Sequence, residues 1–315
     1  MNQINHFING KFTGPSARTA PVYNPAIGEQ IATVSLASAS EMEQAIAVAK
    51  DAFVSWSQTT PLSRARVLFK FKAILEERVD ELADAITREH GKVYEDARGE
   101  IVRGMEVIEY ACGIPTALKG DFTEQVGRGI DAWTTNQALG VVAGITPFNF
   151  PAMVPMWMWP LAIACGNTII LKPSEKDPTA TNLAAEWAKE AGLPDGVLNV
   201  VHGDKEAVDT LLNDERIKAV SFVGSTPIAE YIYGTGCSQG KRVQCFGGAK
   251  NHMIIMPDAD LDQAADALIG AGYGAAGERC MAISVAVPVG KETADKLIAK
   301  LIPRVESLKV GPYTA

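Results

Sequence analysis

Residues 139–151 read LGVVAGITPFNFP. The first seven, Leu139–Ile145, are apolar or glycine, and a turn with two prolines and an asparagine follows at once. A continuous apolar run of this kind predicts a strand buried on both faces, which is typical of a parallel sheet. Four more such runs follow along the chain: Thr168–Leu171, Val197–Val201, Ala219–Val223 and Arg242–Phe246.

Helical patterns lie between these runs, notably at Thr181–Ala191, which ends at Gly192, and at Lys205–Leu212. Strands that alternate with helices indicate an α/β fold with a doubly wound parallel sheet. Such sheets bind ligands beyond the carboxyl ends of their strands. The chemistry is therefore expected in the residues that directly follow each apolar run.

The first 137 residues follow other patterns. Turn signals separate short β-prone pieces in residues 1–35, and Ser40 with Glu43 has the spacing of a capping box for the next helix. Pro61 is suited to the first position of a second helix, and amphipathic patterns continue to about Lys119. Residues 121–137, with glycines near their middle, predict a β-hairpin.

Composition excludes several classes of protein. The 315 residues are 47% hydrophobic and 21% charged with a formal net charge of −8, which disfavours a nucleic-acid-binding protein. The longest apolar run, Pro151 to Cys165, contains Pro155 and Pro160 and is too short to span a bilayer, so it predicts a buried helix and no membrane partner. The first residues resemble no targeting peptide, which predicts a cytoplasmic protein.

The five cysteines are an odd number without a CxxC pair, and the four histidines are scattered, so free thiols and no metal site are expected. Cys280 differs from the others because it lies among small residues in the stretch GAAGERCM, next to Arg279, which would favour the thiolate. The remaining cysteines are expected to be small buried apolar residues: Cys112, Cys165, Cys237 and Cys245.

Polar residues follow three of the strands. Asn149, between aromatic residues and prolines, could donate to a developing oxyanion, although turn formation alone explains it better. Lys172 and Glu175 could bind a ribose or lie in a solvated loop, and the loop is the simpler explanation. Ser225 begins a predicted helix, where an anion-binding turn and an ordinary helix start are equally good interpretations.

The order and spacing of five motifs resemble the aldehyde dehydrogenase superfamily. The motifs are Thr146–Pro151, Leu171–Glu175, Phe222–Thr226, Gly247–Lys250 and Gly277–Cys280. Three further stretches resemble the CoA-acylating, methylmalonate-semialdehyde dehydrogenase branch of that superfamily: GEIVRG at 99–104 with EYAC at 109–112, AKNH at 249–252, and GERCMA at 277–282.

The resemblance implies a Rossmann-like NAD-binding domain at 1–119 and 138–246, an oligomerisation hairpin at 120–137, and the N-terminal part of a second α/β catalytic domain at 247–315. Members of the family continue well beyond residue 315, so the chain is expected to lack the rest of the catalytic domain. A full-length protein is expected to form a homo-oligomer, a dimer or a tetramer.

The resemblance also assigns roles. Cys280 would attack an aldehyde while the Asn149 amide and the Cys280 backbone N–H hold the oxyanion. Arg103 and Arg279 would hold a substrate carboxylate, although Arg103 also has the spacing for ion pairs with Glu100 and Glu106 on a solvated helix face. NAD contacts would come from Thr146, Phe148, Lys172, Glu175, Lys176, Ser225 and Gly247.

The expected reaction is the oxidation and decarboxylation of malonate or methylmalonate semialdehyde to an acyl-CoA, with NAD as cofactor and coenzyme A as co-substrate. Hydrolytic relatives carry a glutamate where Phe246 aligns, so a carboxylate base is absent there. Two alternatives remain: a hydrolytic aldehyde dehydrogenase, and a non-catalytic NAD-binding relative.

Overall fold

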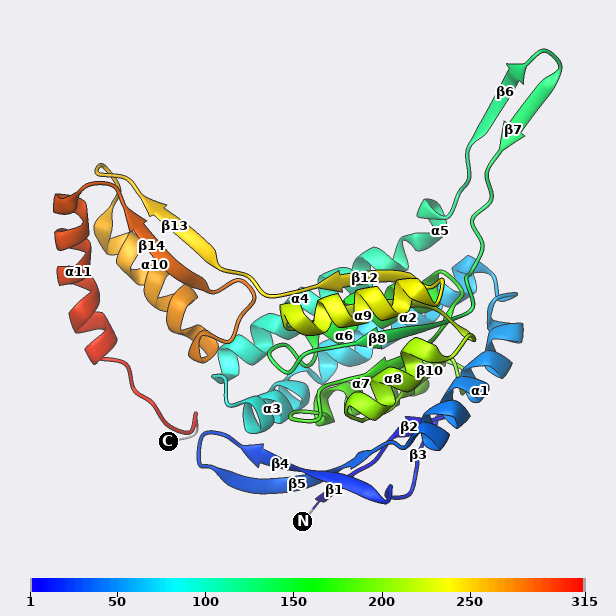
Figure 1. The fold of residues 1–315 in the computed structure, drawn as a ribbon, viewed down its shortest axis with the longest axis horizontal. Coiled ribbons are helices and arrows are strands. Elements are labelled where there is room, and N and C mark those ends of the chain that lie inside the picture. Colours follow the sequence, from blue (N-terminus) through cyan, green and yellow to red (C-terminus); the bar gives the residue numbers. More distant parts are fainter. Residues whose placement is uncertain (1, 314–315) are drawn as a thin grey trace.

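A seven-stranded sheet lies at the centre of the computed structural model, which describes residues 2–313 (Figure 1). Its order is β12-β11-β8-β9-β10-β2-β3, and the five strands from β12 to β10 are parallel. All five predicted strands are present within two residues of the expected ends, so the doubly wound sheet is confirmed. Their bounds are β8 Val141–Ile145, β9 Thr168–Lys172, β10 Leu198–Val200, β11 Ile217–Val223 and β12 Arg242–Phe246.

The chain runs outward from β8 through β9 to β10, then returns to place β11 on the other side of β8. Strand order therefore reverses between β8 and β11, and ligands bind at such a switch point in open α/β sheets. Two short antiparallel strands, β2 (Phe7–Ile8) and β3 (Lys11–Phe12), cover the β10 edge. The connecting helices are α6 Met153–Ala164, α7 Thr179–Glu190, α8 Lys205–Asn213 and α9 Thr226–Ser238.

Side chains of the central strands alternate between two cores. Val142 and Leu171 join one core with α6, α7 and residues of the five N-terminal helices, whereas Val141 and Ile145 join the other with the first N-terminal helix, α8 and α9. Burial on both faces explains why these strands are continuous apolar runs in the sequence. The N-terminal helices are α1 Ala39–Trp56, α2 Pro61–Glu77, α3 Val79–His90, α4 Tyr94–Cys112 and α5 Ile114–Ala117.

Helix α2 begins at Pro61 as expected, and the predicted buried helix is α6, but the capping box of α1 was placed wrongly. It is formed by Ser38 and Glu41 rather than by Ser40 and Glu43. Both pairs have the required spacing, but Glu41 also accepts a hydrogen bond of 2.7 Å from the distant Ser16 hydroxyl. This tertiary contact favours the earlier helix start.

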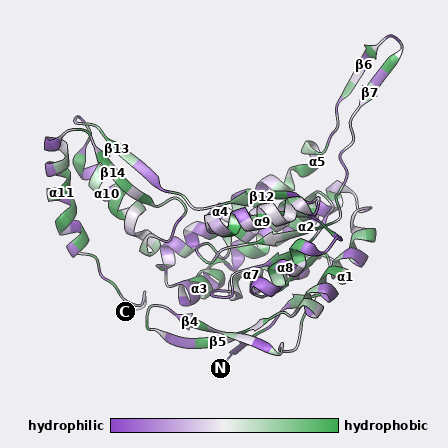
Figure 2. Cartoon of the chain, in the orientation of Figure 1, coloured by the Kyte–Doolittle hydropathy of each residue, from purple (hydrophilic) through white to green (hydrophobic). Residues whose placement is uncertain are grey.

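Two parts extend from the central body. The predicted hairpin is present as β6 (Phe122–Gly127) and β7 (Ile130–Trp133), and it projects away with hydrophobic residues on both strands (Figures 1 and 2). Phe122, Ile130 and Trp133 are exposed there. A small N-terminal sheet, in the order β1-β5-β4, lies below the body in Figure 1; its strands are β1 Asn2–Ile4, β4 Arg18–Asn24 and β5 Glu29–Leu36.

The last part of the chain forms a separate lobe at the opposite end from the hairpin (Figure 1). Its parallel strands β13 (Asn251–Ile255) and β14 (Ile283–Pro288) pack against α10 (Leu261–Tyr273) and α11 (Lys291–Glu306). A short 3-10 turn, η1 (Gly274–Gly277), follows α10 and leads to Cys280. Within residues 2–313, no helix is both long and apolar enough to cross a membrane.

Candidate active site

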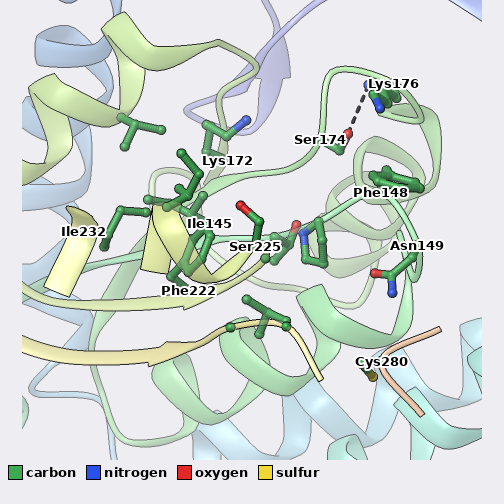
Figure 3. Close-up of a pocket in the computed structure, with 18 of the residues that line it drawn as sticks. Ile145, Phe148, Asn149, Lys172, Ser174, Lys176, Phe222, Ser225, Ile232 and Cys280 are labelled. Carbon is green, nitrogen blue, oxygen red and sulfur yellow. Dashed lines mark hydrogen bonds between the residues drawn. The ribbon is translucent and has the colours of Figure 1, made fainter. Parts of the chain in front are cut away.

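A pocket of about 940 Å³ opens at the carboxyl ends of β8, β9 and β11 (Figure 3). This is the switch point of the sheet, where the fold predicts a ligand. The volume lies near the upper end of the range of roughly 300–1,000 Å³ for ligand pockets. Residues expected to bind a cofactor line it together with those expected to do chemistry: Thr146, Phe148, Asn149, Lys172, Glu175, Lys176, Ser225, Gly247, Arg279 and Cys280.

The Lys172 ammonium lies on the wall of this pocket, at the end of β9. It donates to the carbonyls of Pro173 and Gly203 at 2.8 Å each, and it lies 3.5 Å from the Glu175 carboxylate. Burial lowers the pKa of Lys172 because the charged form loses its hydration. Lys172 is therefore fixed by the protein rather than free in a solvated loop.

Ser225 precedes α9, and its hydroxyl makes no hydrogen bond to the helix amides, so these first N–H groups are available to a ligand. Gly247 passes close to this helix start: a Cβ atom there would lie 2.8 Å from the Thr226 hydroxyl. The glycine lets the chain after β12 pass next to α9. Apolar side chains line the neighbouring wall, including Ile145, Phe222 and Ile232 (Figure 3).

The Phe148 ring lines the pocket and lies against Lys176 and His90. The Lys176 ammonium is 4.5 Å from the ring centroid, and the buried His90 ring stacks on Phe148 at 6.1 Å. Burial, together with the charge of Lys92, lowers the pKa of His90 to about 3, so this imidazole is neutral at pH 7. The Glu278 carboxylate, two residues before Cys280, lies 3.7 Å from His90 Nε2.

Asn149 and Cys280 come from different parts of the chain and line the same end of the pocket in Figure 3. Asn149 is on the loop after β8, and Cys280 is on an exposed turn of the C-terminal lobe (Figure 3). Asn149 Oδ1 is buried and has no hydrogen-bond partner within residues 2–313. The Asn251 amide donates to the carbonyls of Cys280 (2.8 Å) and Ala282 (3.0 Å) and so ties the turn that holds Cys280 to β13.

Arg279 lines the pocket, but its guanidinium forms an ion pair with Asp96 on α4 and a 3.3 Å hydrogen bond to the Gly270 carbonyl. The guanidinium also packs on Gly274, where a Cβ atom would lie only 2.6 Å from Nη2. Gly274 therefore leaves the space in which Arg279 reaches Asp96.

Arg103 is not among the residues that line the pocket. Its side chain on α4 is 68% exposed and pairs with Glu106, as the helix spacing predicted. The expected second pair, with Glu100, is wrong, because the Glu100 side chain is fully buried and pairs with Lys92. The structure therefore brings together one of the two predicted carboxylate-binding arginines and Cys280.

Other predicted residues lie elsewhere. Phe246 ends β12 with 52% of its surface exposed, and it does not line the pocket. The five cysteines are free, as expected, but Cys237 is exposed rather than buried because it lies on the last turn of α9 and faces outward. Within the described residues, no cluster of side chains suited to a metal ion is found.

Sequence reasoning missed Asp96, His90 and the Lys92–Glu100 pair. These residues lie on α3, on α4 and in the loop between them, more than forty residues before the motif at Thr146–Pro151. Their spacing is that of an ordinary polar helix and loop. Only the packing of α4 against α6 shows that they surround the site.

A family model described as "Aldehyde dehydrogenase family" matches residues 12–315. The malonate-semialdehyde dehydrogenase of Pseudomonas aeruginosa is 59% identical over 315 residues, which cover 100% of this chain and 63% of that protein. A solved structure of a putative methylmalonate-semialdehyde dehydrogenase from Sinorhizobium meliloti, complexed with NAD, is 60% identical with a TM-score of 0.98 and covers 100% of this chain and 64% of its own.

A second solved structure, the methylmalonate-semialdehyde dehydrogenase from Oceanimonas doudoroffii, is 57% identical with a TM-score of 0.98, again covering 100% of this chain and 64% of its own. The chain thus spans a little under two thirds of the length of these relatives. The match covers every motif that forms the pocket. On this evidence, the chain belongs to the aldehyde dehydrogenase family.

Proposed function

We propose that this chain carries the cofactor site and the nucleophile of an NAD-dependent aldehyde dehydrogenase that converts malonate or methylmalonate semialdehyde, with CoA, into an acyl-CoA and CO₂. One observation carries the proposal: Asn149 and Cys280 line the same pocket as the carboxyl ends of β8 and β11. The relatives described above act on such semialdehydes by name.

The residues of the pocket fit a dinucleotide. Apolar walls would hold the adenine, the free N-terminus of α9 at Ser225 would hold a phosphate, and Lys172 with Glu175 would bind ribose hydroxyls. Phe148 and Gly247 also line the pocket and are proposed to contact the cofactor. A relative of 60% identity and the same fold is described in complex with NAD, which supports the assignment.

Cys280 is suited to be the nucleophile because its thiol is free and exposed on the turn that faces the pocket. The thiolate would attack the aldehyde carbon and push the carbonyl electrons onto oxygen. The Asn149 amide and the Cys280 backbone N–H would donate to that oxygen. Donors that are already in place stabilise such charge without reorganising.

NAD, when bound, would accept the hydride from the former aldehyde carbon, and a thioester on Cys280 would remain. Loss of CO₂ from the carboxylate of the acyl group would leave a thioester enolate, and a proton from solvent would convert it into the propionyl or acetyl thioester. The CoA thiolate would then attack the thioester carbonyl and release the Cys280 thiolate. This last step returns the chain to its starting state, with NADH, CO₂ and acyl-CoA as products.

We assign the substrate carboxylate to Arg279 and, on the basis of the family resemblance, to Arg103. Arg279 lines the pocket beside Cys280, and a guanidinium binds a carboxylate through two parallel hydrogen bonds. In the structure its partner is the Asp96 carboxylate. Arg279 thus already binds one carboxylate, that of Asp96, and the substrate carboxylate would share or replace this contact.

CoA is proposed as the acyl acceptor because Phe246 stands where hydrolytic relatives carry a glutamate. Water attacks a thioester slowly unless a base removes its proton, and a positioned base contributes about 10²–10⁴-fold. A phenyl ring accepts no proton. A thiol is partly ionised near pH 7 and is intrinsically more nucleophilic.

The test mixes the complete protein that contains this chain with NAD⁺ and malonate semialdehyde, with and without CoA. Without CoA we expect one burst of NADH per site, and with CoA steady turnover and acyl-CoA. Rapid multiple turnover without CoA would favour the hydrolytic alternative, and the absence of any NADH would favour a non-catalytic NAD-binding protein.

Two further properties belong to the proposal. The exposed apolar residues of the β6–β7 hairpin support its predicted role in a homo-oligomer, because an isolated two-stranded hairpin is only marginally stable in water. The five free thiols agree with a reducing compartment, and we propose a cytoplasmic enzyme.

A further inference from the structure

A buried ion pair lies behind the active-site loop, outside the pocket. Lys92 is in the loop between α3 and α4, and Glu100 is on the second turn of α4. Their side chains are 1% and 0% exposed, and the Lys92 ammonium donates to the Glu100 carboxylate. Neither residue lines the pocket, so neither is expected to contact the cofactor or the substrate.

The other hydrogen bonds of this pair all reach one short segment of the chain. Lys92 Nζ donates to the Asn149 carbonyl oxygen at 2.7 Å and lies 4.4 Å from the centroid of the Phe150 ring. The second oxygen of Glu100 accepts from the backbone N–H groups of Ala152 (2.9 Å) and Met153 (3.2 Å). The pair thus holds both ends of residues 149–153.

These contacts also fix where α6 begins. Ala152 and Met153 are the cap and the first residue of that helix, and the helix has no side-chain cap of its own. The Glu100 carboxylate supplies the missing acceptor, and a negative charge near a helix N-terminus is favourable. The turn between β8 and α6 therefore depends on two side chains from a distant helix and loop.

Burying two charges is costly, since both lose their hydration. Burial raises the pKa of Glu100, while Lys92 and the two amides oppose that rise. An apolar pair of the same size would fill this space with less loss of hydration. A role in holding residues 149–153 in one geometry accounts for the charges better than stability does.

The geometry matters because Asn149 begins this segment. Its side chain lines the pocket, and its buried Oδ1 accepts no hydrogen bond from the part of the chain that the structure describes, so no hydrogen bond of that oxygen fixes the amide. The orientation of the amide then depends on the backbone, which Lys92 holds at the carbonyl of the same residue. A donor displaced by a fraction of an ångström loses much of its effect on the transition state.

We infer that Lys92 and Glu100 are positioning residues that hold the Asn149 amide where the oxyanion forms. The inference rests on the proposed function, because it needs an oxyanion at Cys280. It adds two residues that act through Asn149 rather than on the substrate.

The test uses the variant Lys92→Met/Glu100→Gln in the complete protein that contains this chain. Lys92→Met alone would leave a buried carboxylate without its partner and threaten folding, whereas the double change removes both charges. The glutamine amide would keep an oxygen for the backbone N–H groups of Ala152 and Met153. The matched control is Arg78→Met/Glu190→Gln, which removes an ion pair of 2.7 Å at the ends of α2 and α7, whose residues do not line the pocket.

We expect kcat for aldehyde oxidation to fall about 10–100-fold, somewhat less than the loss of about 10²–10³-fold when an oxyanion donor is removed. KM, NAD affinity and the rate of Cys280 alkylation by iodoacetamide should change less than about threefold, because neither residue lines the pocket. In an Asn149→Ala background the same double change should have little further effect on kcat, since the amide is already gone. The control variant should keep its kcat.

Hydrogen exchange of the backbone amides in residues 149–158 gives a readout that does not depend on activity. It should accelerate in the double variant and not in the control. Unchanged exchange, an unchanged kcat, or a full additional loss in the Asn149→Ala background would each overturn the inference. If exchange in this segment accelerates in the double variant as expected but the wild-type protein oxidises no aldehyde, the result would refute the proposed function instead.

Discussion

The two segments that meet at the pocket are held in opposite ways. Residues 146–153 rest on buried charges, aromatic contacts and a helix start, whereas Gly274–Met281 forms a turn that includes exposed residues. Ala275 and Ala276 in that turn have φ values of 52° and 54°, which cost an alanine roughly 1–2 kcal/mol each. Few hydrogen bonds tie it to the lobe, chiefly those of Asn251 and Arg279.

The difference teaches how the two roles divide. Asn149, the proposed oxyanion donor, would only have to stay in place, and it lies on a buried support. Cys280, the proposed nucleophile, would have to be reached by an aldehyde, by the cofactor and by an acyl acceptor, and it lies on an accessible turn. Substitutions in the turn that holds Cys280 should therefore affect catalysis with little effect on folding. Substitutions of Lys92 or Glu100 should affect both catalysis and folding.

The largest expected effect is that of Cys280→Ala. We expect NADH formation to be abolished, while the melting temperature and NAD binding stay close to those of the wild type, because Cys280 is exposed and packs in no core. Turnover and NAD titration measure both. Cys245→Ala is the matched control, with a packing cost of about 1–2 kcal/mol and retained turnover. An active Cys280→Ala variant would remove the nucleophile from this turn.

The next effect concerns the two arginines. Arg279→Leu should lower kcat/KM for malonate semialdehyde, mainly by raising KM, because a charge-assisted contact to the substrate carboxylate is lost. The expected loss of transition-state stabilisation is about 2–4 kcal/mol. Arg103→Leu should have a smaller effect, since its side chain is largely exposed on α4 and outside the pocket. Steady-state kinetics with the semialdehyde and with propanal, which has no carboxylate, separate substrate binding from structure. Equal losses on both substrates would indicate a purely structural ion pair with Asp96.

A third prediction concerns how the stability of the folded protein depends on pH through the buried His90. The pKa of His90 is about 3 in the folded protein and near 6.5 when unfolded, so between these values the unfolded state binds the extra proton. Stability should therefore fall as the pH drops below about 6.5. His90→Phe should weaken this fall, because phenylalanine keeps the contact with Phe148 and does not titrate. The groups facing this imidazole are Lys92 and Glu278.

Melting temperatures at pH 7 and pH 5 measure the effect. His252→Phe is the control, since His252 is an exposed residue of β13. The wild type and the His252 variant should lose more stability on acidification than the His90 variant. An identical loss in all three would mean that His90 is not the group responsible.

The smallest effect is expected for cofactor choice. Glu175 is partly exposed beside Lys172, where its charge would repel a 2′-phosphate. NAD should be preferred over NADP, and Glu175→Ala should narrow the preference by about tenfold, or roughly 1.4 kcal/mol. Kinetics with both cofactors measure the ratio. Equal use of NAD and NADP by the wild type would contradict this role.

Patterns that repeat along the chain could be predicted from the sequence. The five parallel strands were found within two residues because burial on both faces leaves a continuous apolar run. The residues after β8, β9 and β11 were singled out because the fold places ligands there, but the roles proposed for them came from the family resemblance. Cys280 stood out through its small neighbours.

Features that depend on distant contacts could not be predicted. The capping box was placed two residues late because only the fold shows that Ser16 reaches Glu41. Glu100 was assigned to a solvated face because its helix spacing looks ordinary, whereas packing of α4 against α6 buries it. Cys237 was expected inside because its type is commonly buried, yet the last turn of α9 faces outward.

Gly274 has a consequence for how the sequence can vary. A methyl group there would meet the Arg279 guanidinium, which is the mobile end of a long side chain, rather than the backbone. The chain could therefore accept alanine by moving the guanidinium away from Asp96 without unfolding. If Arg279 binds the substrate carboxylate as proposed, alanine at 274 would weaken that contact by displacing the guanidinium, and would shift the preference from acidic aldehydes toward uncharged ones.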